Sequence, residues 1–209
     1  MVEASEGRAG PRIGGPNGAA KRLFDVVGAA GALALLGPPM LLIAAAIRLS
    51  GPGGALYRQR RITRGGREFT ILKFRTMRAG AEDATGPVWA SAGDPRVTRL
   101  GRLLRRTSLD ELPQLINVLR GEMSIVGPRP ERPQLVRQIS EALPIYRVRH
   151  AVRPGITGWA QVNYSYGSSV EDARIKLEYD LYYLKHAGVV LDLLILLRTV
   201  PVMLRAEGT

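Results

Sequence analysis

Residues 26–47 read VVGAAGALALLGPPMLLIAAAI, a run of 22 residues without a charged side chain. As a straight helix this run would be about 33 Å long, which matches the hydrocarbon core of a bilayer. Two prolines follow Gly37 in its middle, and a proline lacks the N–H group and clashes with the preceding turn of a helix. The run therefore predicts a membrane segment over residues 21–50 with a break at Gly37, Pro38 and Pro39.

Basic residues flank this apolar run on both sides. Lys21 and Arg22 precede it. Six arginines follow it, namely Arg48, Arg58, Arg60, Arg61, Arg64 and Arg67. A helix that spans a membrane usually has its positive charges on one side only. A kinked spanning anchor is one interpretation, and a re-entrant helix-break-helix that returns to its starting side is the other. We favour the re-entrant form, and a buried soluble helix ranks below both because little else in the chain can cover its faces.

The composition is that of a folded and strongly basic protein. The 209 residues are 45% hydrophobic and 23% charged, and 30 Lys and Arg against 18 Asp and Glu give a net charge of +12. This apolar content is too high for a disordered basic tail. The absence of cysteine excludes disulfides, thiolate metal clusters and cysteine nucleophiles, and the two histidines argue against a multi-histidine metal site. The charge predicts a polyanionic partner: nucleic acid, an anionic membrane surface or a phosphorylated substrate.

The rest of the chain predicts a leader and a mixed domain. Residues 1–20 are rich in Gly, Ala and Pro without periodicity, which predicts a disordered leader, and 79–95 form a loop. Segments 56–62 and 67–74 carry β-type residues around a turn, which predicts a small β-hairpin. Apolar residues at helical spacing predict helices at 96–106, 112–119, 132–142, 170–186 and 190–205. GPRP at 127–130 and RPGITG at 153–158 predict rigid turns. We expect an α+β, mostly helical protein.

The helix at 96–106 alternates leucine and arginine, as amphipathic helices at a membrane interface do. A solvated helix face is the alternative interpretation. If the helix lies at the membrane interface, anionic membrane lipids are an expected partner of the domain at 51–209.

The segment RRTSLDELPQL at 105–115 carries the clearest chemical signal. Ser108 and Glu111 have the S-x-x-E spacing of a capping box. Pro113 conflicts with a helix capped by Ser108, because it would fall at the fifth helical position, so the helix is kinked or starts later. In both cases Asp110 and Glu111 lie near a helix N-terminus, where unpaired N–H groups favour anions.

Asp110 and Glu111 are adjacent, so on a helix their side chains point about 100° apart and cannot flank a glycosidic bond as a hydrolase pair does. Basic residues accompany them, namely Lys73, Arg75, Arg105, Arg106 and Arg129. Two acidic groups among basic ones fit a magnesium-bound diphosphate, in which Mg²⁺ takes oxygen ligands and the cations neutralise the phosphates. An ordinary salt-bridged surface is the alternative.

Several long segments of the chain resemble one family, in the same order. They are KRLFDVVGA (21–29), LKFRTM (72–77), RRTSLDELPQLINVLRGEMSIVGPRP (105–130), RPGITGWAQVN (153–163) and YDLYYLKH (179–186). Over residues 21–205 the chain resembles the bacterial sugar transferases, the monotopic phosphoglycosyl transferases that act on polyprenol phosphate. Residues 165–186 look like the branch that initiates exopolysaccharide synthesis, and the chain resembles the minimal catalytic unit.

The resemblance implies an enzyme that transfers a sugar 1-phosphate from a UDP-sugar to a polyprenyl (undecaprenyl) phosphate and releases UMP. Its location would be the cytoplasmic face of the bacterial inner membrane. The acidic pair of the family falls on Asp110 and Glu111. Asp110 would be the nucleophile that forms a covalent phosphosugar. Both residues are expected as ligands of Mg²⁺, the expected cofactor, and accepting the proton of the acceptor is the alternative role for Glu111.

The resemblance also implies roles for basic residues and for the break in the membrane segment. The phosphate-contacting arginines of the family fall on Arg105 and Arg129, and its basic KFR element falls on Lys73 and Arg75. The break, typically Ser-Pro in the family, reads Gly37-Pro38-Pro39 here. The missing serine removes one hydroxyl that could bond the backbone but leaves the expected bend.

A membrane-tethered basic module that binds nucleic acid is the competing function. It accounts for the charge of +12 but for neither the double proline nor the acidic pair, and we find no recognised nucleic-acid motif. We therefore expect UDP-sugar, polyprenyl phosphate and anionic lipids as partners, and no nucleic acid.

Overall fold

A computed structural model describes residues 16–81, 94–164 and 169–204 of the chain. Residues 1–15 of the leader predicted at 1–20 lie outside these ranges, as does most of the loop predicted at 79–95. The helices are α1 (Pro16–Leu49), α2 (Arg99–Arg106), α3 (Gln114–Leu119), α4 (Pro133–Ala142), α5 (Trp159–Asn163), α6 (Val170–His186) and α7 (Val189–Leu204). The strands are β1 (Leu56–Ile62), β2 (Glu68–Phe74), β3 (Ser124–Val126) and β4 (Gly155–Thr157). The 3-10 turns are η1 (Arg64–Gly66), η2 (Leu109–Glu111) and η3 (Pro144–Ala151).

The architecture confirms a mostly helical α+β protein with a small β-hairpin. All five helices predicted from apolar spacing are present within the described residues, as α2, α3, α4, α6 and α7. The hairpin pairs β1 with β2 antiparallel, from Leu56 opposite Phe74 to Ile62 opposite Glu68. Its turn needs glycine, because Gly65 and Gly66 both have φ near +74° (73° and 74°), where other residues are strained.

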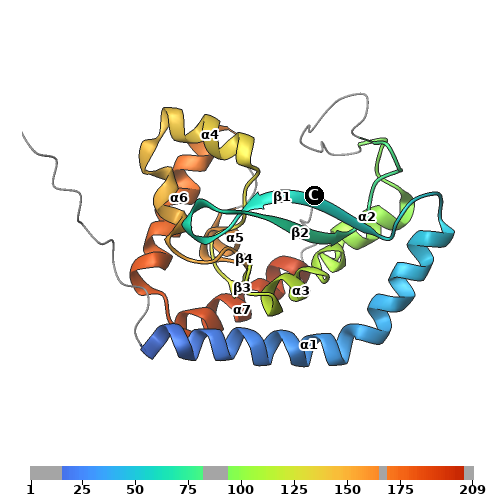
Figure 1. The fold of residues 1–209 in the computed structure, drawn as a ribbon, viewed down its shortest axis with the longest axis horizontal. Helices are drawn as coiled ribbons and strands as arrows, with labels where there is room; N and C mark the ends of the chain where they lie inside the picture. Colours follow the sequence, from blue (N-terminus) through green and yellow to red (C-terminus); the bar gives the residue numbers. More distant parts are fainter. Residues whose placement is uncertain (1–15, 82–93, 165–168, 205–209) are drawn as a thin grey trace, which may run out of the picture.

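Helix α1 contains the whole apolar run and differs from its prediction in two ways. It begins at Pro16, so residues 16–20, which were predicted in the leader, are helical. A proline is tolerated there because the first N–H groups of a helix have no partner within it. The helix is also not interrupted at Gly37, Pro38 and Pro39: it is one continuous helix that bends (Figure 1). By length and composition, Gly18–Leu49 could cross a membrane.

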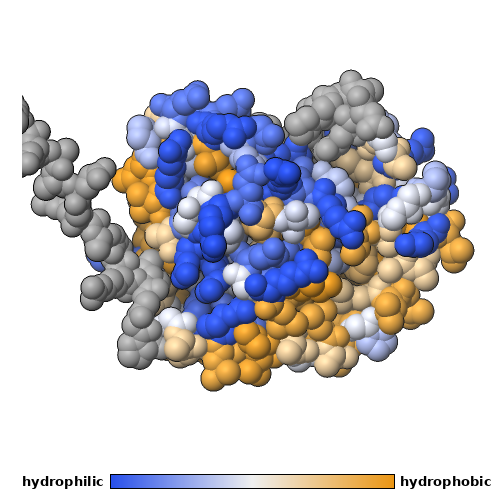
Figure 2. Space-filling view, in the orientation of Figure 1, coloured by the Kyte–Doolittle hydropathy of each residue, from blue (hydrophilic) through white to orange (hydrophobic). Residues whose placement is uncertain are grey.

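The domain packs against one side of α1 along both halves of the helix, which explains why the turns on either side of the prolines stay helical. Ala29 lies in a buried cluster with Leu115 and Met123. Ile47 lies in another with Phe74. The opposite side of α1 exposes apolar residues, namely Leu23, Val27, Leu35, Leu41, Leu42 and Leu49. In Figure 2 this apolar edge runs along the bottom of the molecule, below a hydrophilic region.

The segment predicted as a rigid turn at 153–158 contains strand β4, which pairs in parallel with β3, the strand directly before the GPRP turn. Neither strand was predicted from the sequence. Ser124 pairs with Gly155, and Val126 pairs with Thr157. The backbones approach so closely that a Cβ on Gly155 would lie 2.1 Å from the nitrogen of Gly127. This pair therefore holds the GPRP segment, and Arg129 within it, against the segment that follows Arg153.

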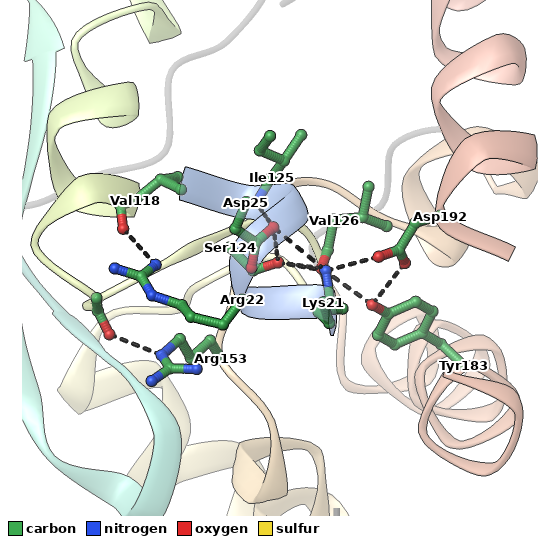
Figure 3. Close-up of polar contacts among 11 residues, drawn as sticks. Lys21, Arg22, Asp25, Val118, Ser124, Ile125, Val126, Arg153, Tyr183 and Asp192 are labelled. Atoms are coloured by element: carbon green, nitrogen blue, oxygen red, sulfur yellow. Dashed lines mark hydrogen bonds and ion pairs between the residues drawn. The ribbon is translucent and has the colours of Figure 1, made fainter. Parts of the chain in front are cut away.

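A buried polar network fixes the first turns of α1 to the domain (Figure 3). Lys21 Nζ donates to Ser124 Oγ at 2.6 Å and pairs with Asp192 at 2.7 Å and Asp25 at 3.4 Å. Asp25 accepts hydrogen bonds from Ser124 Oγ at 2.9 Å and from the Ile125 N–H at 3.0 Å. Asp25 and Asp192 are both buried. The network therefore ties α1 to β3 and to α7.

Candidate active site

Asp110 and Glu111 lie on η2, a short turn between α2 and α3. Ser108 has a left-handed conformation (φ 54°, ψ 14°), and its side chain makes no capping hydrogen bond. The capping box is thus absent, because the left-handed residue ends one helical segment instead of starting the next. Of the two alternatives left by the sequence, the later start is correct: α3 begins after Pro113.

Glu111 is held by two cations that come from distant parts of the chain. Its Oε1 pairs with Lys73 Nζ of β2 at 2.6 Å and with Arg129 Nη2 at 2.8 Å. Burial alone would raise the pKa of Glu111, but Arg129 and Lys73 together lower it well below its ordinary value. Glu111 is therefore ionised at neutral pH and acts as the fixed centre of a basic cluster.

Asp110 is in a different state, although it is the neighbour of Glu111. Its side chain is buried (8% exposed), and within the described part of the chain no group donates a hydrogen bond to it. Burial raises the pKa of Asp110 to about 6, while Lys73 and Arg129 oppose this effect and Glu111 adds to it. Above pH 6 it is an ionised carboxylate whose oxygens are not engaged, which is the state that a nucleophile requires.

The structure brings five of the six predicted site residues together and places one elsewhere. Lys73 and Arg129 contact Glu111, and the positive charge of Arg105 acts on Asp110. Arg105 Nε also donates to Thr76 Oγ1 at 2.9 Å, which fixes the direction of its side chain. These groups form a site with two carboxylates and three cations, as the sequence predicted.

Arg75 is the residue whose predicted substrate-binding role the structure does not support. Its guanidinium donates to the carbonyl oxygens of Ile47 (3.1 Å) and Gly51 (3.2 Å), and also to that of Pro52. Arg75 lies just beyond the last residue of β2, where the backbone carbonyls at the end of α1 and in the turn after it are within reach of its guanidinium. Arg75 fastens the C-terminal end of α1 to the domain.

Helix α3, which follows the acidic pair, is held by residues that the sequence analysis missed. Asn117 is fully buried, accepts the Leu72 N–H at 3.0 Å and donates to the Thr70 carbonyl at 2.8 Å. Arg22 of α1 donates to the carbonyl of Val118 at 2.7 Å (Figure 3). It also donates to the carbonyl of Leu119 at 3.0 Å. The sequence did contain a signal for the contacts of Asn117, because an asparagine among the apolar residues of a helix needs hydrogen-bond partners when it is buried.

Asp110 and Glu111 supply carboxylate oxygens, which are the ligands that Mg²⁺ prefers. Among the described residues, no group of three or more Asp, Glu, His or Cys side chains could hold a metal. Magnesium bound with a diphosphate needs only one or two protein carboxylates, because phosphate oxygens and waters complete its shell. Glu111 Oε2 has only a long contact, at 3.5 Å from Arg129 Nη1. This oxygen and the Asp110 carboxylate therefore fit a site in which Mg²⁺ binds together with a diphosphate.

Comparisons with known proteins agree with this geometry. The model of the bacterial sugar transferase family matches residues 16–206. The chain belongs to the bacterial sugar transferase family. Membership in this family favours a transferase over the nucleic-acid-binding module.

Curated relatives in this family carry more specific names. The UDP-N-acetylgalactosamine-undecaprenyl-phosphate N-acetylgalactosaminephosphotransferase of Aeromonas hydrophila is 45% identical over 188 residues, which cover 90% of this chain and 44% of the relative. A UDP-glucose:undecaprenyl-phosphate glucose-1-phosphate transferase of Caulobacter vibrioides is 48% identical over 190 residues, which cover 90% of this chain and 71% of the relative. The exopolysaccharide production protein ExoY of Rhizobium meliloti is 36% identical over 206 residues, which cover 92% of this chain and 88% of the relative. The chain thus spans less than half of the Aeromonas sugar transferase.

Proposed function

We propose that the protein transfers a sugar 1-phosphate from a UDP-sugar to undecaprenyl phosphate. The products are UMP and an undecaprenyl-diphosphate-sugar, the first membrane intermediate of exopolysaccharide or glycoconjugate synthesis. The observation that carries the proposal is the contrast within one acidic pair: Glu111 is bound by two cations, whereas Asp110 is buried and receives no hydrogen bond from the residues that the structure describes. The names of the relatives support the choice of substrates.

The proposed reaction has two steps. An oxygen of Asp110 attacks the phosphorus that bears the sugar, the bond from this phosphorus to the bridging oxygen breaks, and UMP leaves with the electron pair. A phosphate oxygen of the lipid then attacks the same phosphorus, and the Asp110 carboxylate is regenerated. Both nucleophiles are anions, so neither step needs a general base.

The basic residues would bind the diphosphate and stabilise the charge on the transferring phosphoryl group. Arg129 is the most exposed of the three cations, and we assign it to the phosphate that leaves with UMP. Lys73 would keep Glu111 in place, and Arg105 would contact the phosphoryl oxygens. Mg²⁺, held by Asp110 and Glu111, would neutralise the diphosphate when bound.

We place the protein at the cytoplasmic face of the bacterial inner membrane, with both ends of α1 on that face. Contacts at the two ends of α1 support this arrangement, because Lys21 near one end and Gly51 just beyond the other are bonded to the same domain. A helix with both ends bonded to one domain fits a segment that returns to its starting side better than one that crosses the bilayer. Positive residues on both flanks favour the cytoplasmic side, and anionic lipids would attract them.

The test is UMP release by the purified protein. UDP-glucose, UDP-N-acetylgalactosamine and other UDP-sugars are each supplied with undecaprenyl phosphate in detergent micelles. We expect at least one donor to give one UMP per lipid product, and Asp110→Asn to give none. Strong retention on DNA with no UMP from any donor would overturn the proposal in favour of the nucleic-acid-binding module.

A further inference from the structure

A hollow of about 480 Å³ lies where α1 leaves the membrane-facing edge of the molecule. Residues 50–52, directly after α1, form one wall, and Arg75 with residues 77–79, after β2, forms another. Thr98 and Arg99, at the start of α2, form the third. The hollow thus joins the end of the membrane helix to the domain that carries the acidic pair.

The side chains around this hollow would suit an anion that also has an apolar part. Arg75, Arg78 and Arg99 line it, and none of the described residues that line it is acidic. Arg75 is engaged with backbone carbonyls. Within the described residues, no hydrogen bond or ion pair joins the guanidinium of Arg78 or Arg99 to another side chain. Pro52 and Met77 add apolar surface, so the lining combines free positive charge with hydrocarbon contacts.

The position of the hollow next to α1 indicates that its ligand arrives from the bilayer. Leu49, the last residue of α1, is 89% exposed, and Leu41 and Leu42 are exposed about two turns earlier. An acyl or prenyl chain lying along these leucines would bring its head group to the end of the helix. A lipid that carries a phosphate matches both parts of this surface.

The same hollow adjoins the acidic pair through one extended stretch of chain. Lys73, which binds Glu111, is only two residues before Arg75, a separation of about 7 Å along a strand. Thr76 lies between the two sites and accepts the hydrogen bond from Arg105. A phosphate in the hollow would therefore be close to the cations that surround Asp110.

We propose that this hollow is the docking site for the phosphate of the polyprenyl acceptor, with Arg78 and Arg99 as its free cations. The proposal rests on the proposed transferase function and assigns a place to the second substrate. The acceptor phosphate would dock between these arginines after UMP has left, and then attack the phosphosugar on Asp110. Phospholipid head groups share the phosphate chemistry, so the test must separate the two lipids.

The test compares two double variants with the same change in net charge. Arg78→Gln with Arg99→Gln removes the free cations of the hollow. Arg58→Gln with Arg102→Gln removes two exposed arginines that do not line it. We expect the first variant to raise the KM for undecaprenyl phosphate about tenfold or more, since contacts between a cation and a phosphate are among the stronger hydrogen bonds. UMP release from the UDP-sugar alone should persist.

Binding without turnover tests the hollow independently of the reaction. Farnesyl phosphate is titrated calorimetrically into each protein in micelles, with farnesol as the uncharged control. We expect the Arg78/Arg99 variant to lose affinity for farnesyl phosphate about tenfold relative to the Arg58/Arg102 variant, and farnesol binding to be equal.

Each outcome of these experiments separates one failure from another. Equal KM values and equal farnesyl phosphate affinities in the two variants would overturn the docking site. Weaker binding of the Arg78/Arg99 variant to phosphatidylglycerol vesicles, with an unchanged KM, would overturn it in favour of a phospholipid site. Absence of UMP release by the unaltered protein would instead refute the transferase function, and the farnesyl phosphate titration would still decide on the hollow.

Discussion

Lys21→Met is expected to destabilise the protein strongly, because Lys21 is the shared partner of Asp25 and Asp192. The Lys21 side chain is 19% exposed, and that of Asp192 is fully buried. Removing one partner of a buried ion pair costs about 3–5 kcal/mol, since the other charge stays buried without compensation. Methionine keeps most of the stem of lysine, so packing changes little. For a domain of this size the loss corresponds to a melting temperature about 6–20 °C lower.

The assay is thermal unfolding in detergent micelles, followed by intrinsic fluorescence, with Arg174→Met as the control. Arg174 also pairs with two carboxylates, Glu171 at 2.6 Å and Glu178 at 2.7 Å, but all three side chains are exposed. Exposed pairs contribute little because water and salt screen them. We therefore expect the control to melt close to the unaltered protein, although it loses the same charge.

The pH dependence of the Lys21→Met effect has a definite sign. Burial raises the pKa of Asp192, and Lys21 opposes this effect. Without Lys21 the folded-state pKa rises further above the unfolded value. When the pKa of a carboxyl is higher in the folded state than in the unfolded state, the free energy of unfolding decreases as pH rises from the unfolded-state pKa to the folded-state pKa. Below the unfolded-state pKa the carboxyl is protonated in both states and causes no such loss. The deficit in melting temperature should thus be smaller near pH 4 than at pH 7.5.

Two results would refute this account of the network. One is a Lys21→Met protein that melts no lower than Arg174→Met. The other is a failure of Asp192→Asn to recover part of the loss in the Lys21→Met background, where it removes an uncompensated charge. Either would mean that the polar network does not hold α1 against the domain.

Three further predictions concern the site and the backbone. UMP release from a UDP-sugar alone should fall about tenfold per pH unit below the pKa of Asp110, which is about 6, because protonation removes the nucleophile; a rate that stays constant down to pH 4.5 would contradict this. Lys73→Met should lower kcat about tenfold or more, since a charged hydrogen bond contributes about 1.5–3 kcal/mol and 1.4 kcal/mol is a factor of ten, whereas Lys73→Arg should retain more activity in the same UMP assay. Gly155→Ala should unfold at lower temperature because its Cβ would lie 2.1 Å from the Gly127 nitrogen, whereas Gly31→Ala, with nothing within 4 Å, should not.

Local pattern predicted much of the fold. The hairpin and the helices α2, α4, α6 and α7 follow from the spacing of apolar residues, because each buries one face. The pair β3 and β4 could not be predicted in this way, since three-residue strands carry no period. Their pairing depends on the close contact of Gly127 with Gly155, which are far apart in the sequence. The start of α1 was also misplaced, because the Gly, Ala and Pro content of residues 16–20 carries no helical period although the helix begins there.

The acidic pair was found from the sequence, but the contrast within it was not. Two adjacent acidic residues have the same ordinary chemistry, and only the fold decides that Lys73 and Arg129 reach Glu111 while no described residue donates a hydrogen bond to Asp110. Arg75 shows the opposite case. It belongs to a basic motif that matches the family, yet the turn after α1 places carbonyl oxygens around its guanidinium.

The most direct test of the central claim is the mass of the peptide that contains Asp110. The protein is incubated with an accepted UDP-sugar and no lipid acceptor, quenched in acid and digested. We predict that this peptide gains the mass of one sugar phosphate, with up to one UMP released per protein molecule, and that undecaprenyl phosphate removes the adduct. Asp110→Asn should show neither UMP nor adduct, whereas Glu111→Gln should retain some of both. Near-normal turnover by Asp110→Asn, or an adduct on another residue, would contradict the account.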